Sequence, residues 1–171
     1  MMQMLVAGGM TPLSDGERRP DDDNPRGYLE WERIKTLPKD PGCIAEAEGK
    51  VVKVISWLLL SLPANHEYRV IFIERPMLEV LASQDQMLRR RGTYKEGANT
   101  AKLIEEFEEH LRKVDAWLNG KPQVNTLRVA YHDLLRNPKA IGEKLADFLG
   151  VKLNFEAMAE QVDQALYRNR S

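Results

Sequence analysis

The sequence predicts an α/β domain whose central sheet is mainly parallel. Residues 70–73 form a short run of β-branched and aromatic residues, the composition of a strand buried on both faces, as in a parallel sheet. A helix follows at once, because Pro76 suits a first helical position and Gly92 suits the end of a helix. A similar strand pattern at 125–130 precedes another helical pattern. Strands that alternate with helices are typical of this fold class.

The other elements follow from hydrophobic spacing. In residues 50–56, Lys and Val alternate at first and Val and Ile then dominate, which predicts a further core strand. Residues 99–118 carry Leu, Phe and Val on one stripe and predict the longest helix. We also expect helices over 1–9, 57–62 and 138–148 and an amphipathic segment after Phe155.

Length and composition indicate a single domain over residues 1–171, because a chain of this size can bury a sizeable core. The 25 Lys and Arg balance 26 Asp and Glu, so the global basic field of nucleic-acid binders is absent and we expect no nucleic-acid partner. The longest apolar run, at 55–62, is too short to cross a bilayer, and no signal peptide is visible. We therefore expect a cytoplasmic protein that has no membrane partner.

The sequence contains no residue pattern that indicates a disulfide or a metal site. The lone cysteine, Cys43, excludes an internal disulfide and a cysteine-based metal cluster, and it fits a reducing compartment. Its turn-like setting favours an incidental thiol over a nucleophile. The three adjacent aspartates at 21–23 lack the spacing of a ligand set, so we expect no metal.

Arg75 is the residue that directly follows the strand expected at 70–73. The carboxyl end of such a strand faces the ligand crevice of α/β domains. Ser83 lies eight positions further on, about 12 Å along the helix axis. A bound phosphate reaches both residues only if Arg75 folds back along the helix. The spacing alone leaves open that Arg75 is a solvated strand-end residue and Ser83 an ordinary helix-face serine.

Five stretches of the chain resemble, in order, the small bacterial group of PAPS-dependent sulfotransferases. They are D-N-P-R-G-Y-L-E at 23–30, K-V-V-K-V-I-S at 50–56, V-I-F-I-E-R-P-M-L-E-V-L-A-S-Q at 70–84, L-R-V-A-Y-H-D-L-L-R-N-P at 127–138 and F-L-G at 148–150. The resemblance implies a three-layer α/β fold related to P-loop NTPases. It also implies transfer of a sulfuryl group from PAPS (3'-phosphoadenosine 5'-phosphosulfate) to a hydroxyl or amine, on a small-molecule or biopolymer acceptor, without a metal.

The resemblance assigns nucleotide-binding roles to particular residues. In the family an Arg after a buried strand and a Ser on the next helix hold the 3'-phosphate, and Arg75 and Ser83 occupy these two places. A tyrosine at a later strand end contacts the nucleotide region, which implies the same role for Tyr131, while His132 replaces the usual acidic residue.

Arg168 and Arg170 resemble the C-terminal basic residues that close over the nucleotide phosphates, a task that suits guanidinium groups. A frayed basic terminus is the alternative interpretation.

Glu30 and Lys53 are the candidate catalytic residues. The resemblance makes Glu30 the base, because removing a proton from the acceptor needs a carboxylate or a histidine beside the sulfuryl group. A surface glutamate is the alternative, and Asp15 is a weaker candidate for the base. Both acids belong to the polar segment 11–33, which we expect to be a mobile surface loop. Lys53 either extends its ammonium group to solvent or faces the ligand, where it would stabilise the bridging charge.

One part of the family pattern is absent. The family has a first strand and a loop of the type P-R-S-G-T-S before the helix that corresponds to 1–9, and this loop binds the 5'-phosphosulfate. We therefore expect an N-terminally truncated domain or one that has lost this binding, with homo-oligomerisation as one compensation for the exposed sheet. The alternative functions are a non-catalytic nucleotide- or anion-binding remnant and a kinase-like P-loop protein, which the absence of a G-K-S/T motif disfavours.

Overall fold

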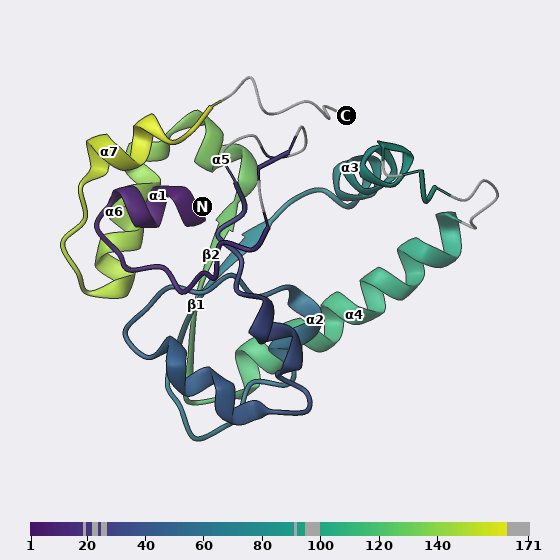
Figure 1. Cartoon of the computed structure of the whole chain (residues 1–171), viewed down its shortest axis with the longest axis horizontal. Helices are drawn as coiled ribbons and strands as arrows, with labels where there is room; N and C mark the ends of the chain where they lie inside the picture. Colours follow the sequence, from purple (N-terminus) through teal and green to yellow (C-terminus); the bar gives the residue numbers. More distant parts are fainter. Residues whose placement is uncertain (19, 22–23, 25–26, 91, 95–99, 164–171) are drawn as a thin grey trace.

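The structure is a computed structural model that describes residues 1–18, 20–21, 24, 27–90, 92–94 and 100–163. Its sheet contains two strands, β1 (Tyr68–Glu74) and β2 (Val124–Ala130). They run parallel, from Tyr68 opposite Val124 to Glu74 opposite Ala130. Both strands end at the same edge of the sheet, so the residues that follow them lie side by side (Figure 1).

Helices account for most of the remaining regular structure among the described residues. The α-helices are α1 (Met2–Ala7), α2 (Ser56–Leu59), α3 (Met77–Arg90), α4 (Thr100–Gly120), α5 (Tyr131–Arg136), α6 (Pro138–Leu149) and α7 (Phe155–Glu160). Two 3-10 helices, η1 (Glu32–Thr36) and η2 (Pro41–Ala47), lie between α1 and α2. None of these helices is both long and apolar enough to span a bilayer.

One face of the sheet packs against α1, α6 and α7. Ile71 and Ile73 of β1 contact a core that includes Met4, Leu145 and Met158. The approach is close, because a Cβ placed on Gly8 after α1 would lie 2.9 Å from the Cγ of Met158. These three helices therefore form one layer, at the left of the sheet in Figure 1.

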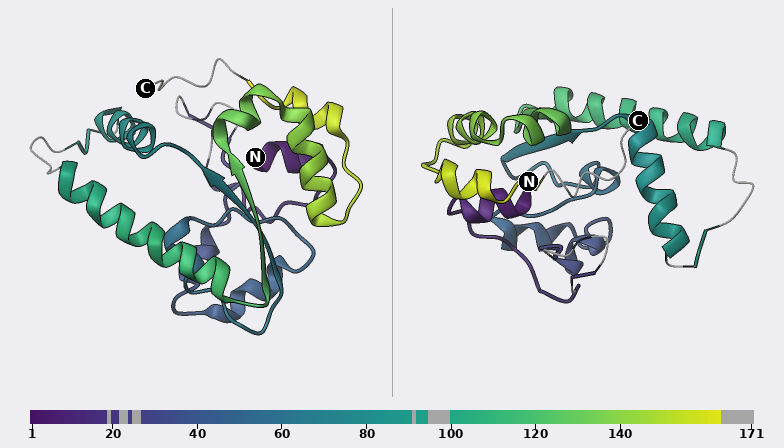
Figure 2. Two further views of the ribbon diagram at one scale, coloured as in Figure 1. Left: turned by 180° about the vertical axis from the view of Figure 1, so that it is seen from behind. Right: turned by 90° about the horizontal axis from the view of Figure 1, so that it is seen from above.

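The opposite face packs against α2 and α4. Val70 and Phe72 alternate with the residues of the first face and contact Val114 and Leu118 of α4 and Leu59 of α2. The view from behind in Figure 2 shows the strands between this layer and the α6–α7 layer. Helices thus cover both faces of a small parallel sheet, which is the predicted α/β arrangement.

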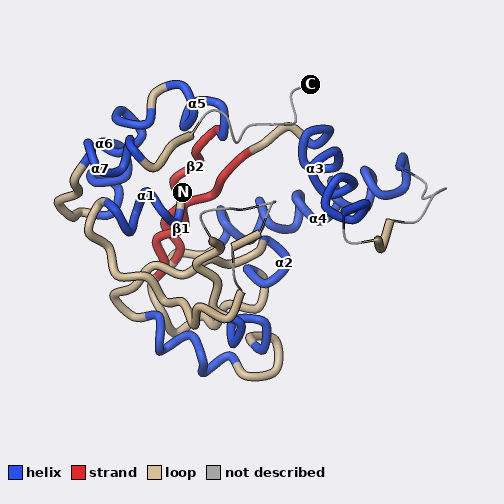
Figure 3. Tube along the Cα trace, turned by 45° about the horizontal axis from the view of Figure 1, so that its top comes forward, coloured by secondary structure: helices blue, strands red, loops and turns tan. Residues whose placement is uncertain are grey.

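The described residues between 10 and 55 form a lobe with a third core. Trp31, Leu37 and Cys43 are buried there with Ile34 and Ile44. Figure 3 shows that this lobe is mostly loop. The buried Trp31 anchors the C-terminal end of the polar segment 11–33 in this core, which the composition of that segment did not predict.

The strand expected at 50–56 is wrong. Within the described residues this segment forms one isolated bridge, between Val51 and Pro12, and then enters α2 at Ser56. Val52 and Val54 are nonetheless packed against buried clusters. The Val and Ile content correctly indicated burial, but a strand also needs a neighbouring backbone edge with which to pair, and residue spacing does not supply one.

Candidate functional site

Four side chains meet where β1 and β2 end, and we call them the Arg75 cluster: Arg75, Glu79, Tyr131 and His132. Nε of Arg75 donates a hydrogen bond to Oε2 of Glu79 at 3.0 Å. Nε2 of His132 lies 3.0 Å from Oε1 of the same carboxylate. The guanidinium carbon of Arg75 lies 4.9 Å from the centre of the Tyr131 ring, within the range of a cation–π contact.

The parallel register builds this cluster. Glu74 pairs with Ala130, so the next residues, Arg75 and Tyr131, are neighbours across the sheet edge. Glu79 lies four residues after Arg75, a spacing that brings side chains together over one helical turn. The cluster therefore joins the start of α3 to the start of α5.

Glu79 is the most buried charged group of the cluster. Its side chain is only 1% exposed. A carboxylate removed from water in this way is stable only when it is paired and hydrogen-bonded. Arg75 and His132 supply those hydrogen bonds, so the position of the Arg75 guanidinium is set by a group inside the protein.

A second carboxylate, Glu30, binds two cationic side chains in the N-terminal lobe. With Arg18, Tyr28 and Lys53 it forms what we call the Glu30 cluster. Nζ of Lys53 donates to Oε1 of Glu30 at 2.6 Å, and Nη1 of Arg18 donates to both carboxylate oxygens at 3.1 Å. The Arg18 guanidinium also lies over the Tyr28 ring, 3.3 Å from its centre.

These contacts determine the charge state of Glu30. Burial alone would raise the pKa of Glu30, but the hydrogen bonds from Lys53 and Arg18 outweigh it, so the pKa is lower than its ordinary value. The carboxylate is ionised at neutral pH and is a weaker base than an ordinary glutamate. The preceding residue, Leu29, has a φ of 46°, a left-handed conformation that is uncommon for a leucine.

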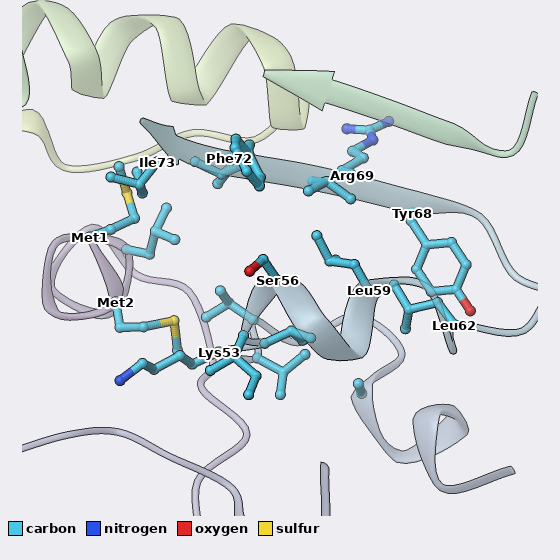
Figure 4. Close-up of a pocket in the computed structure, with 18 of the residues that line it drawn as sticks. Met1, Met2, Lys53, Ser56, Leu59, Leu62, Tyr68, Arg69, Phe72 and Ile73 are labelled. Atoms are coloured by element: carbon cyan, nitrogen blue, oxygen red, sulfur yellow. The ribbon is translucent and has the colours of Figure 1, made fainter. Parts of the chain in front are cut away.

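Both clusters border one open cavity of about 1650 Å³. Arg75 of the first cluster and Tyr28 and Lys53 of the second are among its lining residues. Figure 4 shows the space between β1 and the segment that carries Lys53 and Ser56. The cavity can therefore bring a ligand into contact with cationic groups of both clusters.

Comparison with known proteins gives the family. The family model described as "Sulfotransferase domain" matches residues 54–171, more than half of the chain. The chain belongs to this sulfotransferase family. A search of curated proteins and a search of solved structures each returned no match.

The matched part of the sulfotransferase domain includes some predicted site residues and leaves out others. Arg75, Ser83 and Tyr131 lie inside it, whereas Glu30 and Lys53 precede it. Arg168 and Arg170 also fall within the matched range, but they lie outside the residues that the structure describes.

Ser83 occupies a half-buried position on α3. Its helix neighbours Val80 and Gln84 line the cavity, while Ser83 is not among the lining residues. The structure thus places Arg75 and Tyr131 together and puts Ser83 further along α3, as the separation in sequence requires.

Asp15, the weaker candidate for the base, has a structural role. Its carboxylate accepts a hydrogen bond from the backbone N–H of Glu32 at 2.5 Å and another from the N–H of Glu17 at 3.2 Å. The bond from Glu32 is the main reason that the pKa of Asp15 is lowered. This carboxylate braces the turn before η1.

Sequence reasoning missed three partners of the predicted site residues. Glu79 was visible in principle, because it lies one helical turn after Arg75. His132 adjoins Tyr131 in sequence, but its contact with Glu79 depends on strand pairing. Arg18 gave no signal, since it belongs to a polar segment without periodicity.

Among the described residues no group of three or more His, Cys, Asp or Glu side chains is arranged to hold a metal ion.

Proposed function

We propose that this sulfotransferase domain binds PAPS and takes part in transfer of its sulfuryl group to a hydroxyl or amine acceptor. The observation that carries the proposal is the position of Arg75 beside Tyr131, at the carboxyl ends of two paired parallel strands and at the wall of a large cavity. Ligands of open α/β sheets bind at this edge. The family match favours this function over a non-catalytic remnant or a kinase-like protein.

The proposed nucleotide site centres on the 3'-phosphate. Arg75 would bind it through its guanidinium group, which suits phosphate oxygens. Ser83 would donate its hydroxyl to the same group, and Tyr131 would contact the nucleotide beside it. Glu79 offsets part of the charge of Arg75, so the nucleotide phosphates would need further cationic partners. Arg168 and Arg170 would supply them.

On the acceptor side Glu30 would act as the base. Lys53 would stabilise the negative charge on the oxygen that bridges the phosphate and the sulfuryl group. Lys53 lines the cavity and donates to Glu30, which supports a joint position beside the ligand. Because this contact lowers the pKa of Glu30, Lys53 would have to turn from the carboxylate to the bridging oxygen before Glu30 accepts the proton of the acceptor. The acceptor is a small molecule or a biopolymer that carries a hydroxyl or an amine. We also propose that the protein is located in the cytoplasm and forms a homo-oligomer.

Calorimetric titration with adenosine 3',5'-bisphosphate tests the nucleotide site. Adenosine 5'-monophosphate serves as the matched ligand, since it lacks only the 3'-phosphate. We expect Arg75→Ala and Ser83→Ala each to weaken binding of the bisphosphate at least tenfold, a loss of about 1.4 kcal/mol, and to leave the monophosphate unchanged. Arg112→Ala is the control variant, because Arg112 is exposed on α4.

Arg75 also holds Glu79, so thermal unfolding of each variant is recorded and titrations are made well below its midpoint. Equal affinity of the wild type for the two nucleotides would contradict the 3'-phosphate site. Transfer of radiolabelled sulfate from PAPS that survives Arg75→Ala would contradict the proposed role of this residue.

A further inference from the structure

A serine and a buried histidine form a pair that the proposed sulfuryl transfer does not use. Nε2 of His110, on α4, lies 2.9 Å from Oγ of Ser56, the first residue of α2. His110 is only 2% exposed. A hydroxyl and an imidazole at this separation have the geometry of a nucleophile and its general base.

Aromatic neighbours hold the imidazole in place. The ring of Trp57 stacks on His110 with 3.6 Å between ring centres and an angle of 14° between planes. Phe107 meets the same imidazole edge to face, at 6.1 Å and 84°. Trp57 covers one face of the imidazole, and Phe107 packs at the edge of the stacked pair, so the ring orientation that points Nε2 at Ser56 is restrained.

Ser56 is the member of the pair that a ligand can reach. It lines the cavity, and Figure 4 shows its hydroxyl in the space between α2 and β1. His110 is not among the lining residues. The base therefore lies behind the hydroxyl, as it does where a serine is activated to attack a bound substrate.

The protonation state of His110 suits a base. Burial lowers the pKa of His110, and the positive charge of Lys113 on the same helix lowers it further. The facing helix α2 has the sequence Ser-Trp-Leu-Leu and adds no ionisable side chain. The imidazole is therefore neutral at pH 7 and can accept a proton.

We propose that Ser56 and His110 form a nucleophile–base pair that gives this cavity acyl-transfer activity towards small carboxylic esters. Oγ of Ser56 attacks the ester carbonyl carbon while its proton passes to Nε2 of His110. The C–O bond to the alcohol breaks, and the alcohol leaves with that proton. Water then hydrolyses the acyl-serine. Leu59, Phe72 and Phe107 line the cavity and favour an uncharged, apolar acyl group.

Labelling with a fluorophosphonate tests the pair without any sulfuryl donor. Ser56 attack on phosphorus expels fluoride and leaves a stable adduct that mass spectrometry locates. We expect the folded wild type to be labelled at Ser56, with no adduct at that position in Ser56→Ala. His110→Gln should react about 100-fold more slowly, the usual contribution of a general base. Ser61→Ala, which alters a nearby serine outside the pair, should react like the wild type.

Two results would overturn the proposal. One is labelling of the wild type no faster than of the urea-unfolded chain. The other is a folded His110→Gln variant, checked by circular dichroism, that keeps the wild-type rate. Should His110→Gln fail to fold, the pH dependence of wild-type labelling decides. A rate that levels off above an inflection below about pH 6.5 supports a histidine base, and a rate that rises steadily with hydroxide concentration contradicts it.

The acyl-transfer activity itself is followed with p-nitrophenyl acetate. A burst of nitrophenolate that Ser56→Ala abolishes is expected from an acyl-serine intermediate. Adenosine 3',5'-bisphosphate binding in Ser56→Ala should equal that of the wild type. Failure of this inference and failure of the proposed nucleotide site therefore give different results.

Discussion

The two carboxylate clusters at the cavity differ in how the fold holds them. Glu79 is 1% exposed and is bound by residues at the ends of two paired strands. Glu30 is 17% exposed and belongs to a loop, and its partners come from another loop residue, Arg18, and from Lys53. The first cluster is part of the sheet framework, and the second is part of a lobe with little regular structure.

The difference in burial predicts different roles for the two clusters, one in stability and the other in the reaction. A buried carboxylate with fixed partners costs the fold a great deal when one partner is removed. A partly exposed carboxylate with two long cationic partners contributes less, because solvent screens the charges and the side chains lose freedom. We therefore expect the Arg75 cluster to stabilise the domain and the Glu30 cluster to be more free to change during a reaction.

The largest expected effect is that of Arg75→Ala on stability. The variant leaves the Glu79 carboxylate buried with one hydrogen-bond donor fewer, and we expect the free energy of unfolding to fall by about 3 kcal/mol. Urea unfolding followed by circular dichroism measures it. The double variant Arg75→Ala/Glu79→Ala should be more stable than the sum of the single losses predicts. A loss below about 1 kcal/mol for Arg75→Ala would remove the distinction between the clusters.

A smaller effect is expected for Lys53→Ala. Lys53 is 40% exposed, and Arg18 still donates to both oxygens of Glu30 in the variant. We expect the free energy of unfolding to fall by less than about 1 kcal/mol. Lys102→Ala, which removes an exposed partner of Glu106 on α4, is the control and should change less still. A loss equal to that of Arg75→Ala would show that the lobe is as rigid as the sheet edge.

The smallest effect concerns the pH dependence due to Glu30. Its pKa is lowered in the folded state, so its contribution is complete above the ordinary value of about 4.3 and is lost as pH falls through the lower folded value. Urea unfolding from pH 6 to pH 3 should therefore show a steeper decline for the wild type than for Glu30→Gln. Identical slopes would mean that Arg18 and Lys53 do not hold the carboxylate in solution.

Much of the sheet and helix layer could be predicted from local patterns. The strand pattern at 125–130 and the helical stripe at 99–118 correspond to β2 and α4, because strand composition and the 3.6-residue apolar period of a helix are local properties of the sequence. The helix expected between Pro76 and Gly92 is α3. Local patterns failed at 50–56, where apolar residues are packed without a partner strand.

The site was predictable only in part for the same reason. Arg75 and Tyr131 each follow a strand, so their positions could be deduced one at a time. That Glu79 lies between Arg75 and His132, or that Arg18 and Lys53 share Glu30, depends on contacts between segments far apart in the chain. Residue spacing carries no information on such contacts.

The sequence by itself determined the α/β class, the membership of the sulfotransferase family and the strand-end position of Arg75, since periodicity and local motifs are written in neighbouring residues. Only the tertiary structure decided which charges are paired, how basic Glu30 is, and that Ser56 meets His110 across two helices. These properties arise from burial and from distances between atoms, and both exist only once the chain has folded.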